Sequence, residues 1–226
     1  MEYHIPVLLE PTLAGLRVRP EGCYADLTFG GGGHTRGILE RLGSQGRLLA
    51  FDQDKDTLAH LPTQDARFLF AHANFRFLQN FVRYYQLEAL DGVLADLGVS
   101  SHDFDEANRG FSFRFDSHLD MRMNQTSALS AATLLNTYPE ERLADLLYLY
   151  GELEQARKMA RAIVQARSKQ VLQTTGELCQ CVERFCGKDK KKDLARVFQA
   201  LRMEVNDELS SLKQALQAAT REKDWL

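Results

Sequence analysis

Short apolar runs alternate with amphipathic stretches over residues 23–96. Runs of mostly apolar residues predict strands, and they cover 23–27, 47–51, 67–71 and 92–95. Between them, residues 34–42 and 75–87 carry apolar side chains at helical spacing and predict helices. Alternating strands and helices are typical of an α/β fold, so we expect a doubly wound parallel sheet with helices on both faces.

The pattern changes near residue 105. Residues 105–123 are polar-aromatic and loop-like, and the apolar spacing that follows is helical. Helices are predicted at 130–135, 139–150, 152–168 and 177–185, followed by a charge-rich loop at 188–192. The spacing of Thr174 and Glu177 predicts a capping box at the start of the fourth of these helices.

The last helix is predicted to continue to the end of the chain. Its apolar stripe consists of Leu194, Val197, Phe198, Leu201, Val205, Leu209, Leu212 and Leu216. We therefore expect three parts. They are a Rossmann-like cofactor domain at 1–104, an inserted all-helical substrate-recognition domain at 105–195, and a long helix at 196–226 that returns towards the first domain.

Composition narrows the class of protein. The 226 residues are 44% hydrophobic and 26% charged, which is ordinary for a globular protein. No apolar run approaches the roughly 18 residues that span a bilayer, and the N-terminus lacks a signal-peptide pattern, so a cytoplasmic location is predicted. A net charge of −3 argues against a uniformly basic nucleic-acid-binding chain but allows a local basic patch.

The four cysteines do not predict a metal site. Cys179, Cys181 and Cys186 cluster, but no histidine is near them in the sequence and no C-x-x-C spacing occurs. Buried reduced thiols are the preferred interpretation of these three residues and of Cys23.

The glycine-rich turn at 26–34 carries the strongest chemical signal. A predicted strand ends near Asp26, four glycines follow, and a helix then begins. Glycine lets the backbone approach a ligand where a Cβ would clash. The spacing fails the dinucleotide fingerprint, which disfavours a nicotinamide-dependent oxidoreductase. The alternation of Asp26, Thr28, Gly30 and Gly32 instead resembles the first motif of class I methyltransferases, whose cofactor is S-adenosylmethionine (AdoMet). The alternative is a plain tight turn.

Two carboxylates end predicted strands. Asp52 follows the second strand, where a carboxylate in Rossmann folds accepts the ribose hydroxyls, while Asp54 and Asp56 are interpreted as solvated or helix-capping. Asp96 ends the fourth strand, at the edge where ligands of open α/β sheets bind. Amino-group methyltransferases have a short polar motif there, of which this chain keeps the acid. Capping of the turn at 98–101 explains Asp96 equally well.

Arginine and phenylalanine are interleaved in segment 109–123. Exposed, such side chains would stack bases and hold phosphates. Buried, the same pattern describes an edge strand whose phenylalanines face the core. A second basic group consists of Lys188, Lys190–Lys192 and Arg196. Such a group usually lies in a solvated loop, and contact with RNA is the alternative interpretation.

Taken together, these motifs resemble the RsmH (MraW) family. The similar segments cover nearly the whole chain and are 3–9, 28–34, 51–54, 91–101, 109–123, 196–202 and 204–209. The resemblance implies a class I AdoMet-dependent methyltransferase. Its implied substrate is the exocyclic amine (N4) of a cytosine in the decoding region of bacterial small-subunit ribosomal RNA. The implied partner is that RNA within the assembled small subunit, with no metal and no membrane.

The resemblance also assigns site residues. Cofactor contacts are implied for Gly32, Gly33, His34, Asp52, Phe75, Asp96 and Asp103. Asp96 is the implied catalytic residue, beside the methionine part and the incoming base, and Asp103 stands where the family usually has glutamine. In the segment similar to the family's active-site loop, RNA contacts are expected from Arg109, Phe111, Phe113, Arg114 and Arg122.

The end of the chain departs from the family. The family resumes its sheet after the long helix, whereas this chain ends at Leu226 within the predicted helix, so C-terminal strands are expected to be missing. An open edge on the fourth strand would favour self-association, as in a homodimer, or poor stability. A non-catalytic RNA- or ribosome-binding protein of this fold is therefore the main alternative function.

Overall fold

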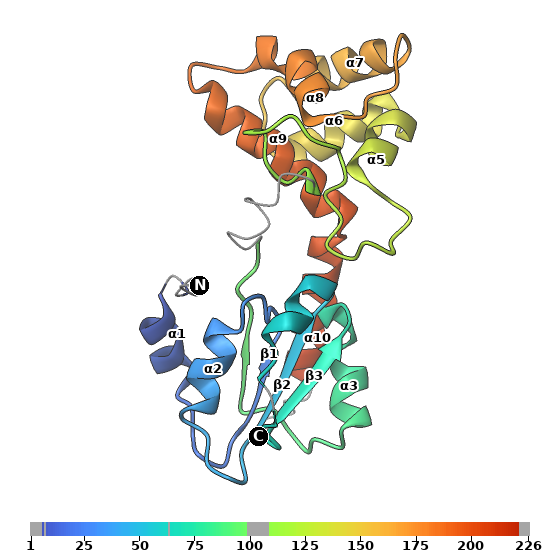
Figure 1. The fold of residues 1–226 in the computed structure, drawn as a ribbon. Coiled ribbons are helices and arrows are strands. Elements are labelled where there is room, and N and C mark those ends of the chain that lie inside the picture. The colour runs from blue at the N-terminus through green and yellow to red at the C-terminus, as the bar shows by residue number, and fades with distance from the viewer. Residues whose placement is uncertain (1–5, 7, 63, 99–108, 222–226) are drawn as a thin grey trace. The chain divides into compact units, whose positions relative to one another are not determined.

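The computed structural model describes residues 6, 8–62, 64–98 and 109–221 (Figure 1). The chain forms two compact units. Met1–Ser100 and Leu209–Leu226 make up the first, here named the sheet unit, and Ser101–Glu208 make up the second, named the helical unit. No helix among the described residues is long and apolar enough to cross a membrane.

The sheet unit is built on parallel strands in the order β3-β2-β1-β4. The strands are β1 (Cys23–Asp26), β2 (Arg47–Asp52), β3 (Phe68–His72) and β4 (Gly92–Leu94). The central pair is almost entirely buried, as interior parallel strands are, and this is why both strands are so apolar. The predicted parallel sheet is confirmed, and β4 is an edge strand among the described residues.

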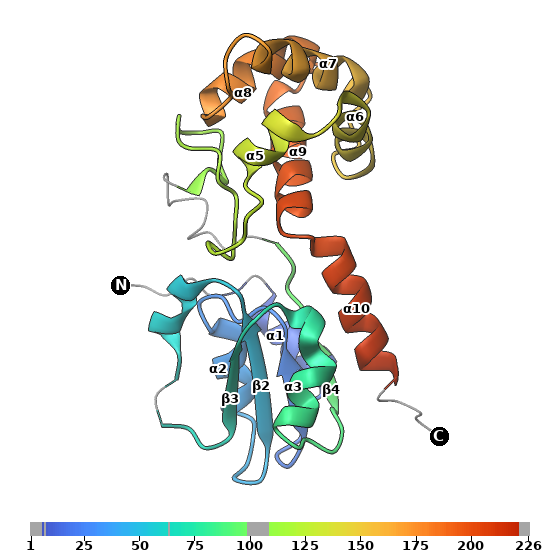
Figure 2. The same cartoon turned by 90° about the vertical axis from the view of Figure 1, so that its right-hand side faces the viewer.

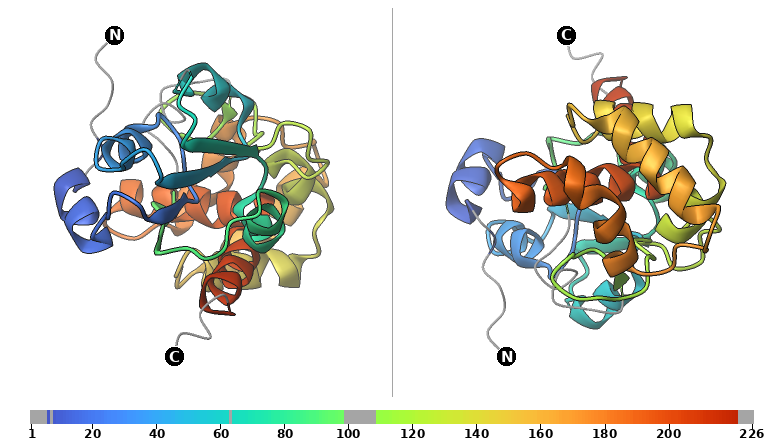
Figure 3. Two further views of the ribbon diagram at one scale, coloured as in Figure 1. Left: turned by 90° about the horizontal axis from the view of Figure 1, so that it is seen from below. Right: turned by 90° about the horizontal axis from the view of Figure 1, so that it is seen from above.

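Helices cover both faces of this sheet (Figures 2 and 3). Tyr24 and Leu48 pack with side chains of α1 (Leu9–Leu16) and α2 (Gly33–Leu39). Ala25 and Leu49, which point to the other face, pack with α3 (Leu78–Tyr84) and α10 (Glu208–Arg221). The doubly wound arrangement is therefore confirmed. The short 3-10 helices are η1 (Lys55–His60) and η2 (Phe75–Phe77), the latter leading into α3.

The helical unit packs its helices around a shared apolar core. Its helices are α5 (Ala131–Thr137), α6 (Glu140–Leu149), α7 (Ala156–Arg167), α8 (Thr175–Val182), η4 (Glu183–Phe185) and α9 (Lys190–Val205). The predicted capping box is confirmed, because the Thr174 side chain accepts from the Glu177 N–H and the Glu177 carboxylate accepts from the Thr174 N–H.

Two boundaries in the helical unit differ from the prediction. The third of these helices, α7, begins at Ala156 rather than at residue 152, because Glu152 has a left-handed φ of 51° that helical backbone does not adopt. Lys190–Lys192 form the first turn of α9 rather than a loop. The Asp189 side chain caps this turn by accepting from the Lys192 N–H at 3.1 Å.

The C-terminal stripe does not form one helix. The chain breaks between α9 and α10 at Asp207, whose φ of 49° is left-handed. Beyond the break, α10 packs against the sheet core through Ala215 and Ala218, whereas Leu209 and Leu216 are 46% and 56% exposed. The prediction of a continuous helix with one leucine stripe is therefore wrong beyond Val205.

Residues 109–130 form a loop, and the edge-strand alternative does not hold. The Met121 N–H donates to the Arg109 carbonyl, and the Leu119 N–H donates to the Gln173 carbonyl, both at 2.9 Å. At the end of α9, the Asn206 side chain accepts from the Met123 N–H and donates to the Met121 carbonyl, both at 2.8 Å. These bonds replace the regular ladder that a strand would need.

Gly110 provides a test of this loop geometry. Its φ is +71°, and a Cβ there would lie 2.2 Å from the His118 carbonyl oxygen. We expect Gly110→Ala to lower the free energy of unfolding by about 2 kcal/mol or more, because backbone strain and a backbone clash add. Gly15→Ala in α1, where a Cβ meets nothing within 4 Å, should instead stabilise slightly. Thermal and urea unfolding measure both; equal stability for the two variants would contradict the loop geometry.

Candidate functional site

The end of β1 is organised by a buried carboxylate. Asp26 is fully buried and accepts from the Thr28 N–H at 3.0 Å and from the Thr35 hydroxyl at 2.8 Å. Burial raises the pKa of this carboxyl, while these two hydrogen bonds and the nearby His34 lower it. Because Thr28 lies in the turn and Thr35 in the first part of α2, Asp26 fixes the path between the strand and the helix.

The glycine turn follows directly. Gly30 and Gly32 have φ of +52° and +73°, which L side chains rarely adopt, and a Cβ on Gly32 would also strike the Phe29 ring at 2.9 Å. Gly31 is different, because its φ is ordinary and a Cβ there would meet nothing within 4 Å. No atom of the described residues therefore requires glycine at position 31, and within that part of the chain the space beside it is open.

Asp52 at the end of β2 braces this turn. One carboxylate oxygen accepts from the Gly30 N–H and the other from the Asp54 N–H, both at 2.9 Å. Asp54 is itself the cap of η1, since its side chain accepts from the Asp56 N–H at 3.0 Å. This agrees with the predicted capping role of Asp54, and it places the Asp52 carboxylate against the glycine turn.

Asp96 joins the same edge from β4. Its backbone N–H donates to the Thr28 hydroxyl at 2.8 Å, which ties the end of β4 to the glycine turn. Its carboxylate is 65% exposed and lies 3.9 Å from the Nδ1 atom of His34. Most of the turn at 98–101, which the alternative capping role of Asp96 involves, lies outside the described residues.

His34 is the clearest sign of a ligand. Its side chain is only 6% exposed, and the buried Nε2 atom has no hydrogen-bond partner within the part of the chain that the structure describes. A buried polar atom without a partner costs about 1–3 kcal/mol, so a native fold normally supplies one. A ligand bound at the glycine turn would supply that partner.

The remaining predicted cofactor residues are placed less completely. Gly33 begins α2, next to the turn. Phe75 begins η2 after β3 and is half-buried against the core shared with α3 and α10. Asp103 lies outside the described residues. The hydrogen-bonding roles of Thr28 and Thr35 were not predicted, although both are small polar residues close to Asp26 in the sequence.

The predicted RNA residues of the helical unit fall into two groups. Arg109 is 9% exposed, donates to the carbonyls of Arg122 and Met123 at 2.9 and 3.4 Å, and lies over the Phe111 ring. Arg122 makes two hydrogen bonds of 2.7 Å to Asp120. These arginines hold the loop together.

Arg114 behaves differently from the other predicted RNA residues. Phe111 is buried and Phe113 packs edge-on against Phe198 of α9, with ring centroids 5.6 Å apart. The Arg114 side chain is exposed and makes no ion pair among the described residues. Phe115, which was not among the predicted residues, is 48% exposed beside it. Arg114 and Phe115 are therefore exposed neighbours on this loop.

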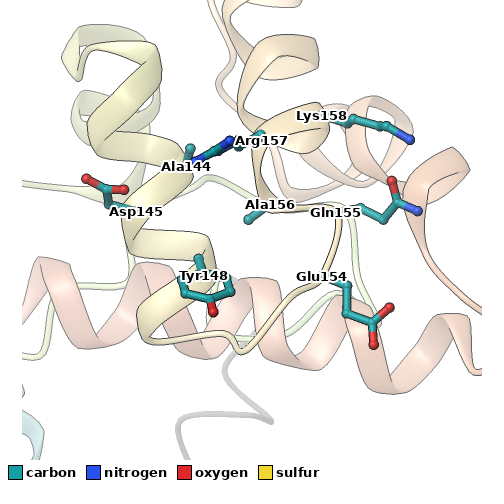
Figure 4. Close-up of a pocket in the computed structure, with 8 residues that line it drawn as sticks. All are labelled: Ala144, Asp145, Tyr148, Glu154, Gln155, Ala156, Arg157 and Lys158. Atoms are coloured by element: carbon teal, nitrogen blue, oxygen red, sulfur yellow. The ribbon is translucent and has the colours of Figure 1, made fainter.

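A hollow of about 490 Å³ lies elsewhere, on the helical unit between α6 and the start of α7 (Figure 4). Its lining mixes both charge signs and consists of Ala144, Asp145, Tyr148, Glu154, Gln155, Ala156, Arg157 and Lys158. It contains none of the buried, unpartnered polar atoms that mark the glycine turn. We therefore assign the site to the turn and not to this hollow. No group of three or more metal-binding side chains occurs among the described residues.

Comparison with known proteins gives the family. Residues 1–223 match the MraW methylase family. The chain is 55% identical over 221 residues to the ribosomal RNA small subunit methyltransferase H of Bacteroides thetaiotaomicron, a match that covers 97% of this chain and 72% of that protein. The proteins of the same name from Porphyromonas gingivalis and Flavobacterium johnsoniae are 54% and 50% identical, covering 96% of this chain and 71% and 72% of theirs. The resemblance seen in the sequence is confirmed, and the chain belongs to the MraW methylase family.

Proposed function

We propose that this chain is an AdoMet-dependent methyltransferase acting on the exocyclic amine of a cytosine in small-subunit ribosomal RNA. Family membership supports methyl transfer, and the relatives' names support this RNA as the substrate. A cytoplasmic location is part of the same proposal. One structural observation carries the cofactor assignment: the unpartnered Nε2 of buried His34, beside exposed Asp96, at the edge where β1, β2 and β4 end. That edge is where open α/β sheets bind ligands.

The residues at this edge fit the parts of AdoMet. Asp52 would accept the ribose hydroxyls, because its carboxylate lies at the carboxyl end of β2, against the glycine turn. Asp96 would accept from the methionine ammonium, and His34 with the N–H groups of the glycine turn would meet its carboxylate. Phe75 would lie near the adenine. Asp103 is proposed as a further cofactor contact on family grounds alone.

The chain's chemical task is alignment. AdoMet supplies a methyl group that is already activated on a positively charged sulfur. A cytosine amine is a weak nucleophile, because its lone pair is delocalised into the ring, so the nitrogen must be held in line with the methyl carbon. The nitrogen would gain the methyl group as the carbon–sulfur bond breaks and leaves its electron pair on the sulfur, and the nitrogen would then lose a proton. Asp96 is the proposed acceptor for the amine N–H. The base must be unstacked to reach this position.

The proposal is tested by methyl transfer to purified small subunits that lack the modification. We expect one labelled methyl group per subunit, located by mass spectrometry on the N4 atom of a cytosine. Binding of AdoMet and subunits without any transfer would instead support the non-catalytic alternative. Binding of NAD in place of AdoMet, read as a rise in thermal stability, would support the oxidoreductase.

Asp52→Asn tests the cofactor site. The variant keeps a similar shape but removes the charge, so AdoMet affinity should fall by about 1.5–3 kcal/mol, or roughly tenfold to a hundredfold. Calorimetry measures the affinity, and thermal unfolding checks that the turn is still formed, because Asp52 also accepts from Gly30. The control is Glu88→Gln, a change at an exposed carboxylate in the same unit. Unchanged affinity in Asp52→Asn would remove Asp52 from the site.

Arg114→Ala and Arg109→Ala separate RNA contact from loop structure. Arg114 is exposed and unpaired in the described structure, so its loss should reduce methylation of small subunits about tenfold without changing stability or AdoMet affinity. Arg109 is buried and donates hydrogen bonds to two backbone carbonyls, so its replacement by alanine should lower the free energy of unfolding by about 2–3 kcal/mol. Unfolding curves and initial methylation rates distinguish the two. Wild-type methylation by Arg114→Ala would exclude Arg114 as an RNA contact.

A further inference from the structure

The first turn of α9 carries three consecutive lysines. The Lys190 ammonium pairs with Glu183 of η4. Lys191 and Lys192 are exposed and make no ion pair within the described part of the chain, and the same is true of Lys188 just before the helix. Segment 183–196 contains six basic and three acidic residues, within a chain of net charge −3. Positive charge is therefore concentrated here.

Helix stability does not explain this placement. The N-terminus of a helix carries partial positive charge, which disfavours each nearby lysine and favours acidic residues. The acidic residues present are already used: Asp189 caps the helix, and Asp193 accepts from the Gly187 N–H at 2.7 Å. Like charges one or two residues apart add repulsion. An anionic partner would relieve both unfavourable effects.

The exposed part of the 109–130 loop packs on α8 and on the middle of α9. Phe113 packs on Phe198 of α9, while the Phe115 carbonyl accepts from the Thr175 hydroxyl of α8 at 2.7 Å. The Asp116 carboxylate accepts from the Gly176 N–H at 2.9 Å. The loop is therefore fixed against both α8 and α9, with Arg114 and Phe115 facing outward.

Cys179 on α8 connects the two regions. Burial raises the pKa of its thiol to about 11, and the charges of Asp116 and Lys190 shift that pKa in opposite directions. Asp116 of the loop accepts from the Gly176 N–H in α8, and Lys190 in the first turn of α9 pairs with Glu183, seven residues further along the chain. The loop and the lysine turn therefore contact the same short stretch of the helical unit, about 10 Å long in a helix.

We propose that Lys188, Lys191 and Lys192, together with Arg114 and Phe115, form a docking surface for the sugar–phosphate backbone of single-stranded RNA. Separated ammonium groups suit a chain of phosphates better than a single small anion. An exposed aromatic ring beside them offers a stacking face for an unpaired base. This inference rests on the proposed function, since it names the part of the chain that holds the RNA substrate.

The test compares two triple variants with the same charge change. Lys188→Glu/Lys191→Glu/Lys192→Glu alters the proposed surface. Arg157→Glu/Lys158→Glu/Lys169→Glu alters exposed residues in and just after α7 that make no ion pairs within the described structure. Both triples place two glutamates in a first helical turn, where they suit the helix dipole, so neither should lower the unfolding midpoint. Any change in RNA binding is then separable from a change in folding.

The probe is a fluorescent single-stranded RNA of about 20 nucleotides, long enough for several phosphate contacts. Anisotropy at several salt concentrations gives the Kd and its salt dependence. The first triple should raise the Kd about tenfold or more at 0.1 M salt. It should also make the slope of log K against log salt concentration less steep by about 2, because each lost phosphate contact changes that slope by roughly 0.7. Phe115→Leu should raise the Kd with the slope unchanged. AdoMet affinity should stay constant in every variant.

The outcomes separate this surface from the proposed function. An unchanged Kd and slope in the Lys188 triple, or an equal loss in the Arg157 triple, would overturn the surface. If the surface were excluded in this way but the wild-type chain still methylated small subunits, the proposed function would be supported without the proposed surface. If the wild-type chain bound RNA through this surface but transferred no methyl group, the proposed surface would be supported and the proposed enzyme activity would be contradicted.

Discussion

A fully buried carboxylate sets the geometry of the sheet edge. Asp26 holds the Thr28 N–H and the Thr35 hydroxyl, and Thr28 in turn uses its own hydroxyl to hold the Asp96 N–H. Burying a carboxyl group without hydrogen-bond partners is costly, so these hydrogen bonds stabilise its buried position. Asp52 adds a second brace from β2 through Gly30. Three strand ends are thereby fixed relative to one another before any ligand binds, which reduces the ordering cost of binding.

Much of this edge could be predicted from the sequence, because parallel strands buried on both faces are short continuous apolar runs. Once the strands were placed, the rule that ligands bind at their carboxyl ends pointed to Asp52 and Asp96. The bond from Thr35 to Asp26 could not be predicted, since it joins a helix to a strand through tertiary packing. The break between α9 and α10 at Asp207 could not be predicted either, because the spacing of apolar residues does not show that an aspartate adopts a left-handed backbone conformation.

The helical unit shows a different limit of sequence reasoning. Arg109, Arg114 and Arg122 are the same residue type within one segment, and the pattern gave them one role. In the structure, Arg109 satisfies buried carbonyls and Arg122 pairs with Asp120, whereas Arg114 is exposed. A guanidinium has five donors in a planar fork, so it serves a buried loop as well as it serves a phosphate. Burial separates the two uses, and burial is a property of the fold.

The helix starts within the helical unit differ in a way that packing does not require. α6 begins with Glu140 and Glu141, and α8 begins with a complete capping box containing Glu177, so both starts agree with the helix dipole. α9 begins with lysines against the dipole, although its buried face is as regular as those of the other helices. Most positions in a natural sequence agree with local structure, and the exceptions concentrate where function requires them. α7 also begins with basic residues, Arg157 and Lys158, so a positive first turn alone does not mark a functional surface. The start of α9 differs because the loop that carries the exposed Arg114 and Phe115 packs on the same helix.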